Sequence, residues 1–286
     1  MSSSSIQALL THHGKQLQNT LSLDAGSARI EVQCLLQAVL QVDRTYMFTH
    51  PERSLDEDQQ SRYSALLERR LCGEPIAYLL GYREFYGLNF KVTPATLIPR
   101  PETELLVELA LQRIPQSGRF HVLDLGTGSG AIALSIANAR PNAAVVAVDD
   151  SKDALDVARD NASSLAIANV HFLLSDWFSA LSGERFDLIV ANPPYIAADD
   201  THLSQGDLRF EPSTALASGT DGLDDIRHII SQAEAHLIPG GWLLLEHGYD
   251  QAEHVRELLN QAGFSGVFSA RDLSGIERVS GGKIKS

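Results

Sequence analysis

The sequence predicts an α/β protein whose larger part is a Rossmann-like domain, preceded by a small helical domain. From about residue 105 onward, short β-rich runs alternate with helical segments. The β-rich runs contain few polar residues, which is typical of a mostly parallel sheet covered by helices on both faces. A glycine-rich segment follows the first run, where such sheets bind a nucleotide-like ligand. These three observations define the expected fold class.

Residues 1–80 are predicted to form a small helical bundle. Gly73 ends the last helical pattern of this region, and Ser27 and Ser54 are expected to cap helix N-termini. Two stretches have apolar residues at three- and four-residue steps: Ile30, Cys34, Leu35, Val39 and Leu40, then Tyr63, Leu66, Leu67 and Leu71. Because this pattern stops near residue 80, we expect the bundle to be a separate domain.

Residues 81–104 are predicted to be a linker that contains a short strand or hairpin. The segment is rich in glycine, proline and aromatic residues, and its prolines mark turns. Residues 105–286 then form the Rossmann-like domain. Its strands are expected at residues 120–125, 143–149, 170–174, 186–192 and 241–248, with helical segments between them.

Composition narrows the class of protein. The chain has 286 residues, a net charge of −13 and two cysteines, Cys34 and Cys72, which form no CxxC pair. We therefore expect neither a disulfide framework nor a thiolate metal site. No apolar run approaches the length of a membrane span, and no signal peptide is recognised, so a cytoplasmic protein is expected. The acidic balance disfavours a protein that grips nucleic acid and suits a basic protein partner better.

Residues 122–130 (VLDLGTGSG) are the strongest local feature. The segment follows a strand and opens a helix, and its glycines allow positive φ and close approach of a ligand to the backbone. The spacing predicts a nucleotide-type ligand, with a tight structural turn as the alternative. Asp149 ends the second strand, 19 residues after Gly130. Its carboxylate is suited to accept hydrogen bonds from ribose hydroxyls. A helix cap is the alternative role, although Asp150 is the better candidate for a cap.

Two further residues favour S-adenosylmethionine over a dinucleotide. Asp124 lies inside the glycine segment, where it would repel a pyrophosphate but could face an ammonium or sulfonium group. Trp177, in the segment 175–178 (SDWF), offers a flat wall for adenine, with an ordinary core tryptophan as the alternative. We expect S-adenosylmethionine as the cofactor, S-adenosylhomocysteine as its product, and no metal.

The segment Asn192-Pro193-Pro194-Tyr195 follows the fourth strand and is the candidate catalytic segment. The prolines fix φ and remove N–H donors, which leaves a rigid loop with available oxygens. The Asn192 side-chain oxygen and the Pro193 carbonyl are expected to accept hydrogen bonds from a planar NH₂ group and stabilise developing positive charge. Tyr195 is expected to stack on that group. A simple proline turn is the alternative.

Other polar residues near strand ends receive no catalytic assignment. Glu246 and His247 end the last β-rich run, and a structural role is favoured for them. Asp272 and Arg278 are candidates for a buried ion pair near the C-terminus. Whether either pair has more than a structural role stays open at this point.

Taken together, these motifs resemble the release-factor glutamine methyltransferases, the PrmC/HemK family. The glycine segment, Asp149, the SDWF segment and Asn-Pro-Pro-Tyr occur in the family's order. More specific are residues 97–104 (LIPRPETE) and 209–212 (RFEP), although the family often has tyrosine where Phe210 stands. The resemblance covers nearly the whole chain. It implies a class I methyltransferase domain with a mostly parallel seven-stranded sheet.

The resemblance also implies a reaction and a partner. The expected substrate is the glutamine of the Gly-Gly-Gln motif in class I peptide-chain release factors, methylated on its side-chain amide nitrogen (N5). The helical domain of residues 1–80 would dock the release factor, and a monomer is expected. Substrate contacts are implied for Asn192, Pro193, Pro194 and Tyr195. Cofactor contacts are implied for Asp124, Leu125, Gly126, Thr127, Gly128, Asp149, Trp177 and Asn192.

Three other functions compete with this prediction. An adenine-N6 nucleic-acid methyltransferase would use the same Asn-Pro-Pro-Tyr segment on a flipped base, but the acidic charge disfavours it. An NAD(P)-dependent oxidoreductase is disfavoured by Asp124. A catalytically silent binding module is disfavoured because Asn192 and Asp149 are both present.

Overall fold

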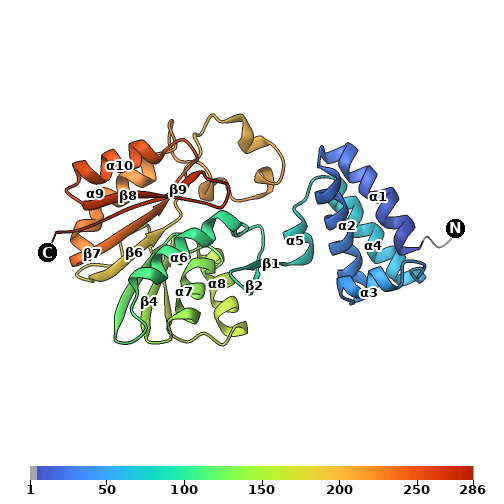
Figure 1. Ribbon diagram of the computed structural model, residues 1–286, viewed down its shortest axis with the longest axis horizontal. Coiled ribbons are helices and arrows are strands. Elements are labelled where there is room, and N and C mark those ends of the chain that lie inside the picture. The colour runs from blue at the N-terminus through green and yellow to red at the C-terminus, as the bar shows by residue number, and fades with distance from the viewer. Residues whose placement is uncertain (1–4, 286) are drawn as a thin grey trace. The chain divides into compact units, whose positions relative to one another are not determined.

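The computed structural model describes residues 5–285 and divides into two compact units (Figure 1). The described residues up to Gly81, together with Gln205–Phe210, form the N-terminal unit. The second unit contains Tyr82–Ser204 and the described residues from Glu211 onward, and is called the catalytic unit below because the candidate catalytic segment 192–195 lies in it. The chain therefore leaves the catalytic unit once, adds six residues to the N-terminal unit, and returns.

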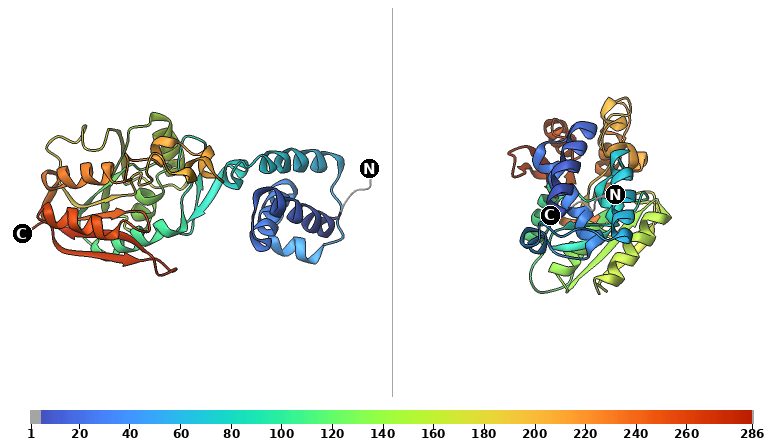
Figure 2. Two further views of the ribbon diagram at one scale, coloured as in Figure 1. Left: turned by 90° about the horizontal axis from the view of Figure 1, so that it is seen from above. Right: turned by 90° about the vertical axis from the view of Figure 1, so that its right-hand side faces the viewer.

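The N-terminal unit is a bundle of helices, seen most clearly in Figure 2. Its apolar core includes the fully buried Leu17, Leu35, Leu36 and Tyr63, which lie on three different helices. The helices are α1 (Ile6–Leu21), α2 (Ala25–Leu40), α3 (Arg44–Thr49), α4 (Glu57–Leu71) and α5 (Ile76–Leu80). Helices α1, α2 and α4 each bury an apolar stripe in this core, and α3 adds Met47, so the bundle is held by packing rather than by helix propensity.

The predicted helix caps in this unit are wrong. Asp24 caps α2, accepting hydrogen bonds from the amides of Gly26 and Ser27, so Ser27 lies inside the first turn. Asp56 caps α4, in a capping box with Gln59. Both helices begin two or three residues away from the predicted serine. The first turns of α2 and α4 are largely exposed, so no apolar periodicity marks the residue at which either helix begins.

Segment 205–210 packs into the N-terminal unit through arginine contacts. The buried Arg70 side chain donates to both carboxylate oxygens of Glu31, at 2.7 and 3.0 Å, and to Asp207 at 3.2 Å. Arg209 donates to the Cys72 carbonyl at 2.8 Å. Gly73 has φ +94°, and the Arg209 guanidinium occupies the space that a Cβ would need. Any larger residue at position 73 would therefore strain the backbone and displace the Arg209 guanidinium.

The catalytic unit begins with an antiparallel hairpin and is built on a seven-stranded sheet in the order β5-β4-β3-β6-β7-β9-β8. The hairpin strands are β1 (Tyr82–Phe85) and β2 (Leu88–Lys91). The sheet strands are β3 (Phe120–Leu125), β4 (Ala143–Asp149), β5 (Val170–Leu174), β6 (Phe186–Ala191), β7 (Leu237–Glu246), β8 (Ser265–Arg271) and β9 (Glu277–Lys283). The first five are parallel, and β9 runs antiparallel to both its neighbours.

Helices cover both faces of this sheet. On one face, Leu106 and Val107 of α6 (Glu104–Arg113) pack with α7 (Ala131–Ala139). On the other face, α9 (Asp224–His236) and α10 (Ala252–Gln261) pack against the alternate strand residues. Helix α8 (Lys152–Ser164) connects β4 to β5 and contacts both. The strand order reverses between β3 and β6, which puts the carboxyl ends of these two strands on either side of a crevice.

The predicted fold class is confirmed. The first four predicted strands match the observed ones to within one residue, because each is nearly all apolar. Strand β7 begins four residues before the prediction, and β8 and β9 were not recognised from the pattern. Strand β8 is half-buried and β9 (ERVSGGK) contains two glycines, so neither has a clear apolar run. Within residues 5–285, no helix is both long enough and apolar enough to span a membrane.

Candidate active site

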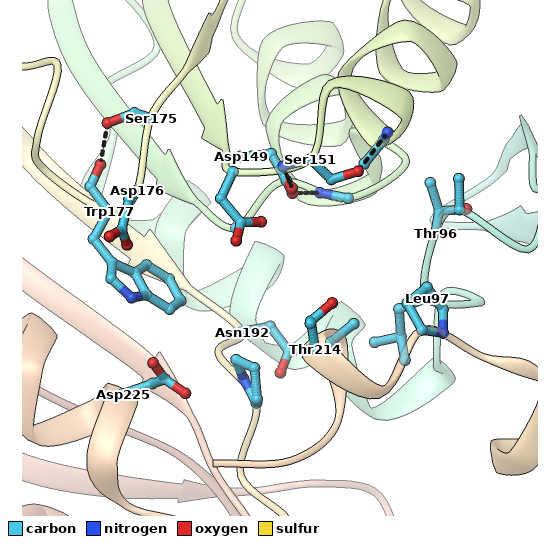
Figure 3. Close-up of a pocket in the computed structure, with 18 residues that line it drawn as sticks. Thr96, Leu97, Asp149, Ser151, Ser175, Asp176, Trp177, Asn192, Thr214 and Asp225 are labelled. Atoms are coloured by element: carbon cyan, nitrogen blue, oxygen red, sulfur yellow. Dashed lines mark hydrogen bonds between the residues drawn. The ribbon is translucent and has the colours of Figure 1, made fainter. Parts of the chain in front are cut away.

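A cavity of about 260 Å³ opens at the carboxyl edge of the sheet (Figure 3). Its walls come from the segments that follow β3, β4, β5 and β6, which are the chain positions that the sequence singled out. Thr96 and Leu97 from the linker contribute another part of the wall. Thr214, in the 3-10 turn Ser213–Ala215, and Asp225, in the first turn of α9, line it as well. Nothing in the local sequence had marked these last two residues.

The glycine segment turns tightly at the end of β3. Gly126, Gly128 and Gly130 all have positive φ, of 70°, 56° and 83°. A Cβ at Gly128 would meet no atom within 4 Å, so this glycine leaves backbone open toward the cavity that it lines. A Cβ at Gly130 would lie 2.9 Å from the Leu134 side chain, so that glycine is needed for packing of α7. The segment thus combines ligand approach with helix packing.

Asp149 lies on the cavity wall at the end of β4. Its two carboxylate oxygens accept hydrogen bonds from the amides of Gly128, at 2.8 Å, and Ser151, at 2.9 Å. Burial raises the pKa of Asp149, and these two hydrogen bonds oppose the rise. The cap of α8 is Ser151, which accepts from the Ala154 amide, so the predicted cap at Asp150 is wrong. Asp149 is therefore held rigidly, and its remaining lone pairs are available to a ligand.

Asp124 is placed behind the glycine segment rather than on the cavity wall. Its side chain is fully buried and accepts hydrogen bonds from the Thr127 hydroxyl at 2.6 Å and the Ala133 amide at 3.2 Å. Among the described residues, its other oxygen has no partner. Burial raises the pKa of Asp124 to about 7. Leu125 and Thr127 are likewise buried and do not line the cavity. Direct cofactor contact by these three residues stays a prediction.

Trp177 faces the cavity in a backbone conformation that is unusual for an aromatic residue. Its φ is +43°, and the Ser175 hydroxyl donates to its carbonyl at 2.8 Å. A Cβ at Gly126 would lie 3.5 Å from the indole, so the ring lies against the glycine segment. Figure 3 shows the indole between Asp176 and the interior of the cavity. Strained positive-φ residues of this size are concentrated at ligand sites, which favours the wall over the core interpretation.

Asn192 follows β6 and lines the cavity together with Pro194. Its side-chain nitrogen donates to the Thr103 hydroxyl at 3.3 Å, which leaves the side-chain oxygen as a hydrogen-bond acceptor. Pro193 is buried behind this wall. Tyr195 is also off the wall, and its carbonyl accepts from Gln251 at 3.0 Å. Burial raises the pKa of Tyr195, so its hydroxyl stays protonated. The predicted stacking role of Tyr195 stays a prediction.

The two most distinctive sequence segments meet in space. Arg100, from LIPRPETE, forms an ion pair with Glu211, from RFEP, and the Ile98 amide donates to the same carboxylate at 3.1 Å. Glu211 is buried, so this pairing joins the linker to the loop that follows Asn-Pro-Pro-Tyr. In the sequence, the only indication of this pairing was that the two proline-containing loops carry opposite charges.

The remaining candidates near the sheet edge differ from one another. His247 is fully buried and pairs with the Ser280 hydroxyl at 2.8 Å and the Gly248 carbonyl at 2.9 Å. Burial lowers its pKa, which fits a neutral structural histidine. Arg278 and Asp272 form an ion pair with an N–O distance of 3.3 Å. Both pairings stabilise the β7–β9 region without approaching the cavity wall.

Comparison with known proteins identifies the family. Residues 9–81 match the PrmC N-terminal domain, and residues 102–213 match the methyltransferase small domain. A Burkholderia pseudomallei protein named release factor glutamine methyltransferase is 54% identical over 94% of this chain and 95% of its own length. The chain belongs to the release factor glutamine methyltransferases. The Salmonella typhimurium and Escherichia coli members are 52% and 51% identical, over 91% and 90% of this chain and 94% and 92% of their own lengths.

Solved structures agree with the fold of this release factor glutamine methyltransferase. A 16S rRNA methyltransferase of T. thermophilus superposes with a TM-score of 0.53 at 23% identity, covering 71% of this chain and 50% of its own. A methyltransferase of Pyrococcus furiosus gives 0.54 at 20% identity, covering 78% of this chain and all of its own. At these identities the likeness concerns the fold alone. The resemblance inferred from the motifs is thus confirmed at the level of family and fold.

Proposed function

We propose that this protein methylates the side-chain amide nitrogen of the glutamine in the Gly-Gly-Gln motif of class I release factors, with S-adenosylmethionine as methyl donor. The names of its relatives, at 51–54% identity over most of the chain, support the substrate class. The main structural support for this reaction is the position of Asn192 on the cavity wall, where its contact with Thr103 leaves the side-chain oxygen as a hydrogen-bond acceptor. The proposal also includes a cytoplasmic location, because release factors act on translating ribosomes.

The residues present fit S-adenosylmethionine. Gly128 offers open backbone, Asp149 offers a half-buried carboxylate for ribose hydroxyls, and Trp177 offers a flat apolar wall. Asp124 lies behind the glycine segment, and its ionised form would favour a sulfonium or ammonium group in the cavity. When bound, the cofactor supplies an electrophilic methyl group. Among residues 5–285, no group of His, Cys, Asp or Glu is suited to a metal ion.

The protein's own contribution to the reaction is alignment and electrostatic stabilisation. An amide nitrogen is a weak nucleophile because its lone pair is delocalised into the carbonyl. Hydrogen bonds from its N–H groups to the Asn192 oxygen and the Pro193 carbonyl would orient the NH₂ group and stabilise positive charge as it develops. The rigid Pro193-Pro194 backbone keeps both acceptors in place. We also assign Pro194, which lines the cavity, and Tyr195, which follows it just off the cavity wall, to the glutamine site.

Residues 1–80 are assigned to docking of the release factor. This unit has its own apolar core and supplies none of the residues that line the cavity. A docking role explains why a methyltransferase would carry it. We further propose a monomer that binds no nucleic acid stably, consistent with the net charge of −13.

The decisive experiment is to incubate the protein with isotopically labelled S-adenosylmethionine and a purified class I release factor, and to map the product by mass spectrometry. The label is expected on the Gly-Gly-Gln glutamine. A factor with alanine in place of that glutamine should stay unlabelled. Single-stranded and duplex DNA and RNA are included as competing substrates. Labelling of adenine, with none on the factor, would replace this proposal with an adenine-N6 methyltransferase.

A further inference from the structure

A chain of polar side chains lies behind Asn192. The Asn192 nitrogen donates to the Thr103 hydroxyl at 3.3 Å, and the Thr103 side chain is one of the groups that oppose the burial-driven rise in the pKa of the neighbouring Glu246 carboxyl. Residues Ala191 of β6 and Leu245 of β7 are register partners, so Asn192 and Glu246 leave the sheet side by side. Thr103 and Glu246 are both buried, with 4% and 1% of their surface exposed.

Glu246 is costly for the fold, which suggests a functional reason for it. It is a buried carboxyl group at the end of an apolar strand, and one of its oxygens has no hydrogen-bond partner among residues 5–285. Arg278 and Tyr195 also oppose the burial-driven rise in the pKa of this carboxyl group. Buried polar groups are normally fully paired, so an incompletely paired one calls for an explanation beyond stability.

We propose that Glu246 and Thr103 are positioning residues that fix which way the Asn192 carboxamide points. The inference rests on the proposed function, in which the Asn192 oxygen accepts from the substrate amide. A threonine hydroxyl has a single proton. When Glu246 accepts that proton, the Thr103 oxygen presents only lone pairs to Asn192, and only the Asn192 nitrogen can bond to them.

The orientation matters because the two ends of a carboxamide have nearly the same shape and opposite hydrogen-bonding character. With the nitrogen held by Thr103, the oxygen of Asn192 is left to accept from the substrate NH₂ group. A flipped carboxamide would present N–H groups to N–H groups, and the transition state would lose its acceptor. Glu246 therefore acts through Thr103 without touching the substrate.

The test compares matched variants by single-turnover methylation of the release factor and by calorimetry of S-adenosylmethionine binding. Thr103→Val keeps the side-chain shape and removes the hydroxyl, and is expected to slow methyl transfer about 100-fold, the scale of a misplaced reacting group. Thr103→Ser keeps the hydroxyl and should restore a rate close to that of the parent. Glu246→Met removes the acceptor and should be slow, whereas Glu246→Gln keeps one and should be faster than Glu246→Met. Cofactor affinity should stay near the parent value throughout.

Two controls separate positioning from stability. Ser280→Ala removes another buried hydroxyl from the neighbouring strand and should leave the rate unchanged. The double variant Thr103→Val/Glu246→Met should be no slower than Thr103→Val, because both act along one route. If Thr103→Val transfers methyl at the parent rate, or if the two substitutions are additive, the proposal is overturned.

A structural readout keeps this inference distinct from the proposed function. In NMR spectra, the side-chain amide protons of Asn192 should be shifted and slowed in exchange in the parent and in Thr103→Ser, but not in Thr103→Val. Unchanged amide signals in Thr103→Val would overturn the positioning role even if the enzyme methylates release factors. Failure of the parent to methylate any release factor would overturn the proposed function, while the amide signals still decide the orientation of Asn192.

Discussion

Two buried carboxyl groups lie near the carboxyl edge of the same sheet, Asp124 in β3 and Glu246 at the end of β7. Both are fully buried, and burial raises the pKa of each to about 7. Asp124 bonds to Thr127 and Ala133, within nine residues of itself in the sequence. The groups that lower the pKa of Glu246 include Thr103 and Tyr195, at least 50 residues away in the sequence. The side of the cavity that we propose for the cofactor is thus organised locally, and the side that we propose for the substrate is assembled from distant segments.

The sharpest test of this contrast is removal of the acceptor on the substrate side. Asn192→Ala is expected to slow single-turnover methyl transfer by a factor of about 100 to 1000, the effect of losing one preorganised partner. S-adenosylmethionine affinity should fall much less, because Gly128 and Asp149 remain. Asn192→Asp should also be slow, since its added negative charge favours the cationic ground state. Near-parent turnover by Asn192→Ala would remove Asn192 from the mechanism.

The corresponding substitution on the cofactor side is Asp149→Ala. Loss of hydrogen bonds to a charged group predicts that S-adenosylmethionine binding weakens by about 1.5–3 kcal/mol. Isothermal titration calorimetry measures this directly. Asp153→Ala, which removes an exposed carboxylate from the same helix start, is the matched control and should bind like the parent. Equal affinity of the two variants would mean that Asp149 does not hold the cofactor.

A shortened chain separates docking from cofactor binding. A chain that begins at Tyr82 should keep cofactor affinity, because every residue lining the cavity lies in the catalytic unit. Its kcat/KM on an intact release factor should fall roughly tenfold or more, corresponding to about 1.4 kcal/mol of lost docking energy. Cofactor titration and circular dichroism show whether the shortened chain is folded. Undiminished kcat/KM in a folded chain would contradict the docking role.

The smallest expected effect concerns the pH dependence of stability. The folded-state pKa values of Asp124 and Glu246 lie above their ordinary values of 3.8 and 4.5, so the folded chain binds these protons more tightly than the unfolded chain. Their stabilising contribution is complete below the ordinary pKa values and is lost as pH rises toward 7. Denaturant titrations at several pH values measure the free energy of unfolding. Over this range it should decrease less for Asp124→Asn and for Glu246→Gln than for the parent. Parallel pH profiles for variant and parent would show that the group titrates normally.

The local organisation of the proposed cofactor side explains why the sequence pointed to three of the residues that line it. The turn after β3 and the carboxylate at the end of β4 occur at fixed spacing, so Gly126, Gly128 and Asp149 were identified as candidates and lie together on the cavity wall. The apolar runs of β3 to β6 likewise define the sheet, because burial on both faces leaves them few polar residues.

On the proposed substrate side, the sequence identified Asn192 but not the residues that contact it. Asn192 was identified because two prolines after a buried strand are unusual, but its contact with Thr103 spans 89 positions and follows no local spacing. Glu246 was assigned a structural role, because its place beside Asn192 depends on the register of β6 with β7. The left-handed backbone of Trp177 also has no sequence signature, since aromatic residues rarely adopt it.

The segment 205–210 has a consequence for the order in which the protein is made. Arg70 is synthesised well before Asp207, its partner 137 positions later, and during that interval Glu31 is its only carboxylate partner among the described residues. The N-terminal unit, although it leaves the ribosome first, is therefore completed only after β6 and Asn-Pro-Pro-Tyr have been synthesised. A nascent chain arrested before residue 205 would carry an N-terminal bundle without Asp207 and Arg209, and its resistance to proteolysis should increase once residue 210 has emerged.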